Sequence, residues 1–357
     1  MRIYLLTIFL MLTFFSCKKE ATPTAPNGNG VIFRHDTLTI PAGWTCLGGE
    51  THWTSNYNKT IVLDINEDVL IGGDYKLMKY GNNHFLNYPQ VTTILNSVMD
   101  ISSMAEDHNN NLWIGCNYTD VIGGPRRGII KFDGNGFTQY TESNSGLHNG
   151  IILSVGVDNS NNKWFGTSNS LVKFDETNWT FFDSTNSPLR EFYPVNCIAN
   201  TIWVGGHNSL TKFDGVLWQE FNHSNSLFPT SGVRILESDH SGNLWFIGFS
   251  SNVLWKFDGV NFTSYSIPIE LPNVNSEYFC IKPDNQNNIW LGGNGKLVKF
   301  DGTNWTNYSA PTYVPGGDPR LPGVGMKFFA GITDIVIKAD SSIWMASSLF
   351  PIMKFKE

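Results

Sequence analysis

The apolar and polar positions of this chain follow a block that recurs along most of its length. Each block has an apolar stretch ending in Trp and Gly, then a Lys beside an aromatic residue, then two aromatic residues spaced three apart. The apolar stretch occurs seven times, at Leu70–Gly72, Trp113–Gly115, Trp164–Gly166, Trp203–Gly205, Trp245–Gly248, Trp290–Gly292 and Trp344–Ala346. The Lys also occurs seven times, at Lys79, Lys131, Lys173, Lys212, Lys256, Lys299 and Lys354. Such a long period indicates a repeat architecture.

The length of the period indicates which architecture. Leu70 and Trp344 lie 274 residues apart over six intervals, about 46 residues each, which is the length of a four-stranded propeller blade. In the second block we expect strands over 98–105, from 112, over 128–132 and over 137–141, joined by turns rich in Asn, Asp and Gly. The sequence therefore predicts an all-β, seven-bladed β-propeller with four-stranded antiparallel blades.

The last block lacks its final strand. The paired aromatic element follows the Lys in six blocks, whereas the chain ends two residues after Phe355. Trp44-Thr45-Cys46-Leu47 has the composition of the missing strand and precedes Leu70 at the right distance. An N-terminal strand that completes the C-terminal blade leaves no open strand edge where the ring closes. We therefore expect the propeller to span 31–357 and to close through Trp44–Leu47.

Composition and charge agree with this fold and exclude some partners. Only 15% of residues are charged, while 14% are aromatic and 34 are Gly, as in short strands joined by tight turns. The net charge is −7 and becomes −8 without residues 1–16, which carry Arg2 and no acid. A protein without a basic field is not expected to bind nucleic acid.

The first residues are typical of an export segment. Arg2 precedes the apolar run 3–15, which is too short to span a bilayer, and Ser16-Cys17 follows it directly. Phe14-Phe15-Ser16-Cys17 resembles a bacterial lipoprotein box, although Phe14 stands where Leu is usual. We expect a signal peptide at 1–16, lipidation of Cys17 and a flexible tether over 17–30. Acyl chains on Cys17 would anchor the protein to a membrane of the cell envelope, for which we expect the outer membrane of a Gram-negative bacterium.

Four cysteines remain after Cys17, namely Cys46, Cys116, Cys197 and Cys280. An even number in an exported chain allows disulfides, but no C-x-x-C spacing occurs and no two neighbouring blades clearly offer a matched pair. We expect the four to be buried, unpaired residues.

Turn and strand residues together show a family resemblance. The run Asp239-His240-Ser241-Gly242-Asn243-Leu244-Trp245 and the stretches 107–115, 158–167 and 284–292 resemble the two-component regulator propeller repeat, which has the pattern Asp, two residues, Gly-Asn-Leu-Trp-Ile-Gly-Thr. Propellers of that family often form the periplasmic sensor half of hybrid histidine kinases in Bacteroidota, many of which respond to glycan fragments. This chain ends after its last blade, without the family's immunoglobulin-like domain, membrane helix and kinase, so we expect a stand-alone form to which the family's direct signalling cannot be carried over.

No motif for chemistry stands out. Asp107 to Asn111 superficially resembles a calcium loop, but its Asp recurs at the same turn in most blades, and the Gly and Glu of a full loop are missing. We therefore expect these Asp residues to form turns and expect no metal and no cofactor. The chain also lacks H-E-x-x-H, G-x-S-x-G, phosphate-loop and dinucleotide patterns. Residues from separate blades could still assemble an active site, so an enzyme is less expected than a binding protein but stays open.

Departures from the repeat are better candidates for function than the repeat itself. The second block gains an extra loop over 117–127, and a Pro- and Gly-rich connection over 309–331 precedes the last block. In a four-stranded winding both loops emerge on one face, which we call the long-loop face. Non-repeated residues expected there, as candidates for ligand binding, are Trp53, Tyr57, Arg126, Arg127, His148, Arg190, Tyr193, His207, His223, Arg234, Tyr278 and Arg320.

Aromatic faces stack on sugar rings, and Arg binds hydroxyls or carboxylates. We therefore expect a cell-envelope lipoprotein whose long-loop face binds a glycan or a protein or peptide ligand. Two alternatives remain, a polysaccharide lyase or glycosidase and a structural assembly subunit.

Overall fold

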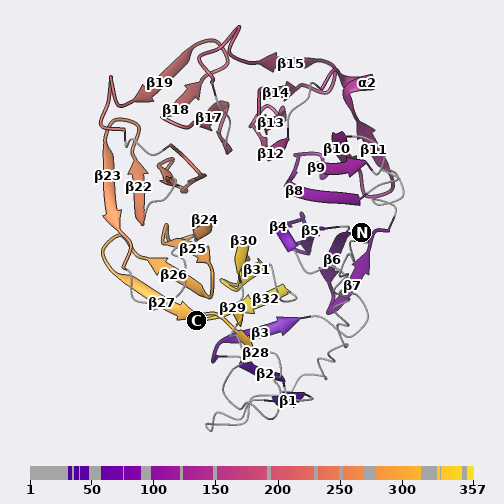
Figure 1. Cartoon of the computed structure of the whole chain (residues 1–357), viewed down its shortest axis with the longest axis vertical. Helices are drawn as coiled ribbons and strands as arrows, with labels where there is room; N and C mark the ends of the chain where they lie inside the picture. Colours follow the sequence, from indigo (N-terminus) through magenta and orange to yellow (C-terminus); the bar gives the residue numbers. More distant parts are fainter. Residues whose placement is uncertain are drawn as a thin grey trace, which may run out of the picture.

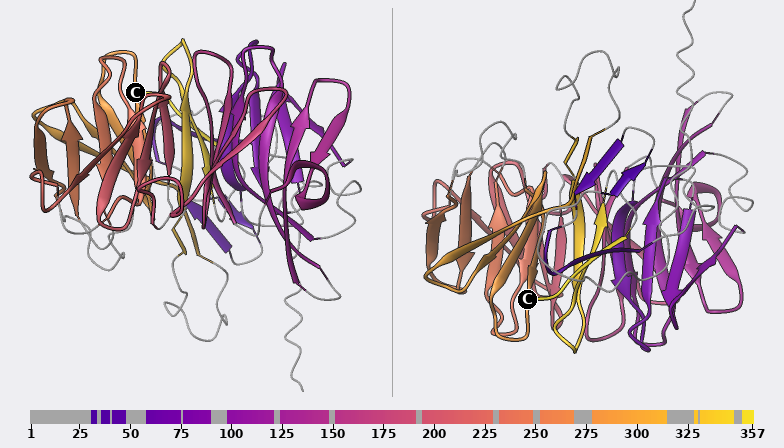
Figure 2. Two further views of the ribbon diagram at one scale, coloured as in Figure 1. Left: turned by 90° about the horizontal axis from the view of Figure 1, so that it is seen from above. Right: turned by 90° about the horizontal axis from the view of Figure 1, so that it is seen from below.

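The computed structural model describes residues 31–33, 36–39, 41–47, 58–74, 76–89, 98–120, 124–147, 151–190, 194–228, 232–248, 252–268, 278–314, 328–329, 331–347 and 352–357. Seven four-stranded antiparallel sheets stand around a central opening (Figure 1). Figure 2 shows the same ring edge-on. The predicted seven-bladed β-propeller is confirmed.

Blades 1 to 3 are formed by the residues between Asn58 and Phe182. Blade 1 contains β4 (Asn58–Leu63), β5 (Val69–Gly73), β6 (Lys76–Gly81) and β7 (His84–Asn87). Blade 2 contains β8 (Val98–Glu106), β9 (Leu112–Asp120), β10 (Gly124–Phe132) and β11 (Phe137–Tyr140), followed by the short helix α2 (Glu142–Ser145). Blade 3 contains β12 (Ile152–Val157), β13 (Lys163–Thr167), β14 (Leu171–Phe174) and β15 (Trp179–Phe182).

The next three blades repeat the same order from the innermost strand outward. Blade 4 contains β16 (Val195–Ile198), β17 (Thr201–Gly205), β18 (Ser209–Phe213) and β19 (Trp218–Asn222). Blade 5 contains β20 (Ile235–Ser238), β21 (Leu244–Ile247), β22 (Val253–Phe257) and β23 (Phe262–Ser266). Blade 6 contains β24 (Tyr278–Pro283), β25 (Ile289–Gly293), β26 (Lys296–Phe300) and β27 (Trp305–Ser309).

Blade 7 joins the two ends of the chain. Its strands are β30 (Ile332–Ile337), β31 (Ile343–Ser347), β32 (Ile352–Phe355) and, outermost, β3 (Trp44–Leu47). β3 pairs antiparallel with β32, with Trp44 opposite Phe355 and the two ring centroids 5.1 Å apart. The predicted closure through Trp44–Leu47 is thus confirmed.

The repeated Lys, Trp and Asp side chains make contacts that stabilise the hairpins of each blade. The recurring Lys lies opposite the recurring Trp on the next strand, as in Lys256 over Trp245 at 5.4 Å from the ring centroid, a cation–π contact. The carboxylate of Asp239 accepts hydrogen bonds from Trp245 Nε1 and Asn243 Nδ2, both at 2.8 Å. These hydrogen bonds lower the pKa of Asp239 even though its burial opposes them. The recurring Asp is therefore a turn-forming residue, as predicted.

Two segments differ from the sequence prediction. The expected loop over 117–127 is largely strand, because β9 and β10 continue as one antiparallel hairpin with Tyr118 opposite Arg126 and Asn117 opposite Arg127. Backbone hydrogen bonding along a long hairpin satisfies more donors and acceptors than an irregular loop does. The expected connection over 309–331 contains β28 (Thr312–Val314) and β29 (Phe328–Phe329).

β28 and β29 belong to an eighth sheet outside the ring. Its order is β1-β2-β28-β29, where β1 (Val31–Phe33) and β2 (Asp36–Thr39) come from the N-terminal end. β2 pairs with β28 through Leu38 opposite Tyr313. The N-terminal region therefore pairs with the C-terminal third twice, once in blade 7 and once in this added sheet. The sequence did not predict the second pairing.

The cysteines agree only in part with the prediction that all four are buried and unpaired. Cys116, Cys197 and Cys280 are free thiols. Cys116 and Cys280 are buried as predicted, whereas Cys46 and Cys197 are only half-buried, which corrects the prediction for these two. Burial raises the pKa of the Cys280 thiol well above its ordinary value, so this residue stays a neutral thiol that packs in the core.

Candidate functional site

The innermost strands carry a repeated irregularity at the end that lies toward the long-loop face. In five blades one residue of the innermost strand is skipped in the pairing with the second strand, which is a β-bulge. The skipped residues are Lys59, Ser102, Leu153, Phe279 and Thr333. A bulge turns one side chain out of the regular alternation of a strand.

These bulged residues share a position in the repeat but not a chemical type. They include a cation, two hydroxyls, an aliphatic residue and an aromatic residue. Leu153 is 40% exposed although it lies on an innermost strand. The bulged position is therefore varied from blade to blade: Lys59 makes ion pairs, whereas the Ser102 hydroxyl donates to carbonyl oxygens of the scaffold.

Arg234 and Tyr278, two of the predicted ligand-binding residues, lie together where blades 5 and 6 meet. The Arg234 guanidinium donates from Nη2 to the Tyr278 carbonyl oxygen. The ammonium of Lys296 lies 4.0 Å from the centroid of the Tyr278 ring. Tyr278 is buried, and its burial raises the pKa of its hydroxyl to about 12, so the phenol is neutral. The cations of Arg234 and Lys296 therefore both contact the neutral Tyr278.

A second charged cluster connects blades 1 and 2. The ammonium of Lys59 lies 2.6 Å from Asp100 Oδ2 and 3.2 Å from Asp74 Oδ1. Burial opposes the charge on Lys59, but the hydrogen bonds and charges of the two carboxylates together raise its pKa. Asp100 Oδ1 is buried without a hydrogen-bond partner in the described part of the chain. This cluster carries one net negative charge.

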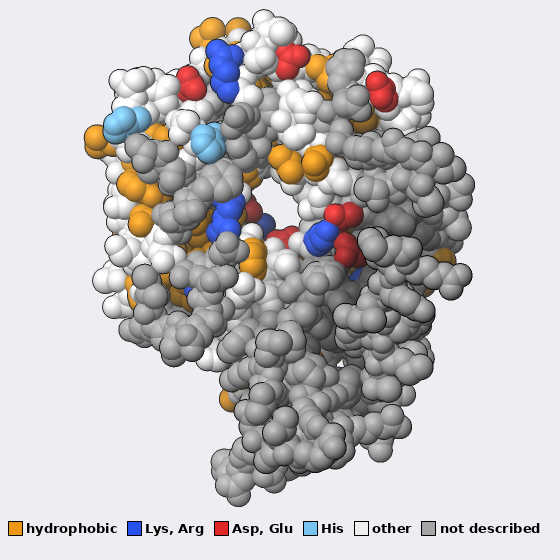
Figure 3. Space-filling model, viewed as in Figure 1, with side chains coloured by type: hydrophobic (Ala, Val, Ile, Leu, Met, Phe, Trp, Pro, Cys, Tyr) orange, Lys and Arg blue, Asp and Glu red, His pale blue; other side chains and the backbone are white. Residues whose placement is uncertain are grey.

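Further charged side chains lie on the innermost strands of blades 5, 6 and 7. Lys282 lies 3.3 Å from Glu237 Oε2, and Asn196 of blade 4 donates from Nδ2 to Glu237 Oε1 at 3.1 Å. The charge of Glu237 raises the pKa of Lys282 and is the largest influence on it. Lys282 lies deep in the ring yet is 37% exposed, as a side chain facing an open channel would be. Figure 3 shows this opening, with basic and acidic side chains at its edge.

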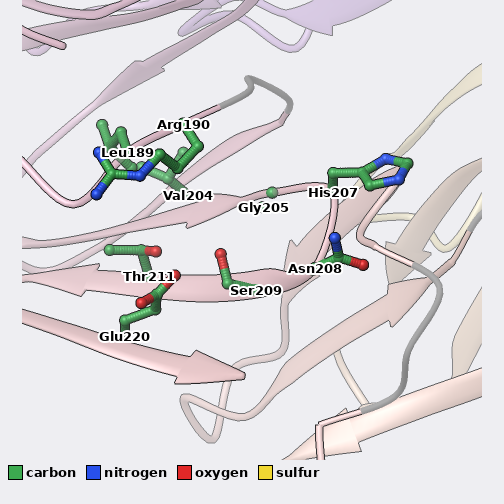
Figure 4. A pocket seen from close by; sticks show the side chains of 10 residues that line it. Leu189, Arg190, Val204, Gly205, His207, Asn208, Ser209, Thr211 and Glu220 are labelled. Carbon is green, nitrogen blue, oxygen red and sulfur yellow. The ribbon is translucent and has the colours of Figure 1, made fainter. Parts of the chain in front are cut away.

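A pocket of about 200 Å³ is lined by blade 4 and by the end of the connection that leads into it from blade 3. Arg190, from the connection between the two blades, and His207, from the β17–β18 hairpin, lie at opposite ends of it (Figure 4). Ser209, Thr211 and Glu220 line its strand side. Arg190 and His207 are exposed, so both side chains can reach a ligand on this face.

Some of the predicted ligand-binding residues lie within the described ranges, and the others lie outside them. Arg190 and His207 share the pocket, Arg234 and Tyr278 share the cation cluster, and His223 is exposed after β19 on the same face. Arg126 and Arg127 are strand residues of β10. The predicted residues outside the described ranges are Cys17, Trp53, Tyr57, His148, Tyr193 and Arg320.

Sequence analysis missed five charged residues of the ring, namely Lys59, Asp100, Glu237, Lys282 and Lys296. The sequence did contain a signal for two of them, because Glu237 and Lys282 occupy the position opposite the recurring Trp, where Val62, Ala105, Gly156 and Val336 stand in other blades. The same position is Asn196 in blade 4, opposite Trp203, so the position is uncharged in the other five blades and a charge there marks a departure from the scaffold.

Within the described ranges no group of three or more His, Cys, Asp or Glu side chains could hold a metal ion. No helix among the described residues is long and apolar enough to cross a membrane.

Comparison with known proteins supports the resemblance seen in the sequence. The family model described as the two component regulator propeller matches residues 95–118, which cover β8 and most of β9. The chain carries a two-component regulator propeller repeat. The matched repeat includes Asp107 and Trp113, whose side chains are joined by a 2.8 Å hydrogen bond. No curated protein sequence matches the chain significantly.

Several solved structures share the fold of this repeat protein. Virginiamycin B lyase from Staphylococcus aureus matches with a TM-score of 0.64 at 13% identity, over 90% of this chain and 99% of that chain. The extracellular domain of a hybrid two-component system from B. thetaiotaomicron matches with a TM-score of 0.61 at 16% identity, over 90% of this chain and 44% of that chain. A structure of YCF48 bound to D1 peptide matches with a TM-score of 0.60 at 12% identity, over 90% and 100%. At these identities the likeness shows the β-propeller fold.

Proposed function

We propose that this protein is a lipid-anchored binding protein of the cell envelope, and that its long-loop face binds a glycan or a protein or peptide ligand. The observation that carries the proposal is the pocket on this face, because two independently predicted residues, Arg190 and His207, line it. A concave site with a few polar groups is the usual form of a ligand site.

Two further observations support the long-loop face as the binding surface. The bulged residues and the Arg234–Tyr278 contact lie toward it, so the non-repeated side chains of several blades are concentrated there. The opposite face carries the repeated Asp turns, in which Asp133, Asp175 and Asp258 each accept hydrogen bonds from backbone amides of their own hairpin. The similar folds include a propeller solved with a peptide and a lyase solved with quinupristin, so this architecture accommodates ligands.

A thermal-shift panel of polysaccharides and peptides tests the binding proposal. The sample is the soluble protein from Val31 onward, which contains every described element. A ligand at 100 times its Kd should stabilise the protein by about 2.7 kcal/mol and raise its Tm. Arg190→Ala and His207→Ala should reduce the shift.

His240→Ala is the matched control, because His240 is also an exposed histidine but lies in the turn between β20 and β21 on the opposite face. Equal loss of the shift in His207→Ala and His240→Ala would argue against the long-loop face. Polysaccharide cleavage that depends on His207 would instead favour an enzyme.

The anchor is tested separately, on the full chain in bacterial cells. The wild-type protein should fractionate with membranes, whereas Cys17→Ser should appear in the soluble envelope fraction, because one cysteine would hold all the acyl chains. Equal fractionation of the two forms would contradict lipidation at Cys17.

A further inference from the structure

Arg234 and Lys296 are two cations that share a neighbour and have no acid beside them within the described ranges. Arg234 precedes β20 in blade 5, and Lys296 begins β26 in blade 6. Both contact Tyr278, one through its carbonyl oxygen and the other through the face of its ring. Among the described residues, the ion pairs involve other Lys side chains, and neither Arg234 nor Lys296 takes part in one.

Both cations are desolvated, which makes this arrangement costly without a ligand. Lys296 is only 7% exposed, and this burial lowers the pKa of its ammonium. Arg234 Nε is buried and has no hydrogen-bond partner among the described residues. A buried donor without an acceptor costs free energy, and a guanidinium donor costs more than a neutral one. An acceptor that also carries negative charge would relieve both costs.

The charges around the opening limit how negative that acceptor can be. Arg234, Lys296, Lys59 and Lys282 supply four positive charges, and Asp74, Asp100, Glu237 and Asp334 are four carboxyl groups on the surrounding strands, so no positive charge is in excess. A dianion such as phosphate would meet these carboxylates without enough compensating charge. A carboxylate has a single charge and two oxygens whose geometry fits a guanidinium edge.

We propose that Arg234, Lys296 and the buried ring of Tyr278 form a binding site for the carboxylate group of a small organic acid. The Arg234 guanidinium and the Lys296 ammonium are the donors, and Tyr278 contacts both cations. The site deepens the proposed function, on which it rests, by naming the ligand chemistry at one point of the long-loop face.

Matched ligand pairs that differ only in the carboxylate test this site. We would measure thermal shifts of the protein from Val31 onward with D-glucuronate against D-glucose, and with N-acetylglycine against its amide, at equal ionic strength set with NaCl. The acid of at least one pair should raise the Tm where its neutral counterpart does not, and the pair that responds shows whether a sugar acid or a simple organic acid is the source. Inorganic phosphate should bind more weakly than the acid.

Variants then assign the effect to the cluster. Arg234→Gln and Lys296→Met should each weaken binding of the acid about tenfold or more, because each removes a charge-assisted hydrogen bond. Lys76→Met is the matched control, because Lys76 begins β6 of blade 1 opposite Gly73 just as Lys296 begins β26 opposite Gly293. It should leave binding unchanged.

Glu277 immediately precedes Tyr278 in the sequence, so Glu277→Gln is a further variant. Tighter binding of the acid in Glu277→Gln would support the site, because this variant removes a negative charge next to Tyr278 in the sequence. Acids that fail to bind both the wild-type protein and Glu277→Gln would overturn the carboxylate site. If neutral ligands still shift the Tm in that case, the proposed binding function stands while this site fails; if nothing shifts it, both fail.

Discussion

At the scale of single residues, one position of the innermost strand shows how the repeat is varied. In blades 2 and 3 this position is Ser, and its hydroxyl accepts a hydrogen bond from the next blade, Ser103 from the Val155 amide at 3.1 Å and Ser154 from the Val195 amide at 3.0 Å. In blade 7 the position is Asp334, whose Oδ2 accepts from the Ile61 amide at 3.0 Å. The hydrogen bond between neighbouring blades is the same in all three, but in blade 7 its acceptor is a carboxylate instead of a hydroxyl.

Asp334 should make stability depend on pH in the opposite direction to the turn-forming Asp residues. Burial is the largest cause of its raised pKa, which the hydrogen bonds and the charge of Lys282 only partly offset. Because the folded pKa exceeds the unfolded value of about 3.9, the native state holds the proton more tightly and stability falls as pH rises through this window. Asp334→Ser should therefore raise the free energy of unfolding at pH 7.5 by about 1 kcal/mol and change it little below pH 4, as measured by urea unfolding.

Asp340→Ser in the same blade is the control, because hydrogen bonds from Ser342 lower the pKa of Asp340. It should give no gain at pH 7.5. A loss of stability at pH 7.5 in Asp334→Ser would mean that the carboxylate itself supports the ring.

At the scale of elements, β3 closes the ring and should contribute as much as an outer strand that is continuous with its own blade. Trp44 is buried and contacts Phe355, just as Trp305 of β27 contacts Phe300 at 4.4 Å. The two pairs occupy the same position in their blades, although the rings of Trp44 and Phe355 are tilted and those of Trp305 and Phe300 are stacked. The pairing of β3 with β32 covers the outer edge of β32, which would otherwise be open.

Trp44→Ala should lower the free energy of unfolding by about 3–5 kcal/mol, the usual cost of truncating a buried Trp. Trp305→Ala should cost less, because Trp305 is only half-buried. Urea unfolding of both variants at pH 7 makes the comparison. If Trp44→Ala were no more costly than a surface substitution, β3 would not be an integral strand of blade 7.

At the scale of the whole molecule, the two faces of the ring differ in what they contain. One face carries hairpins built from the repeated Asp, Gly and Asn, such as Asp301 with the Asn304 amide. The long-loop face carries the pocket with Arg190 and His207, the bulged residues and the Arg234–Tyr278–Lys296 cluster. The scaffold is therefore nearly symmetric, while the candidate site is not.

The sequence by itself determined the number of blades, the strands of each blade, the turn role of the recurring Asp and the closure through Trp44. These features depend on contacts within one repeat or on a missing copy of it, so the period alone reveals them. Only the tertiary structure decided that residues 117–120 and 124–127 are paired strands rather than loop, that β2 pairs with β28 in an added sheet, and that Lys296 and Arg234 both contact Tyr278. These depend on bulges and on pairings between residues far apart in the chain, and no local pattern specifies which side chain a bulge turns toward a neighbouring blade.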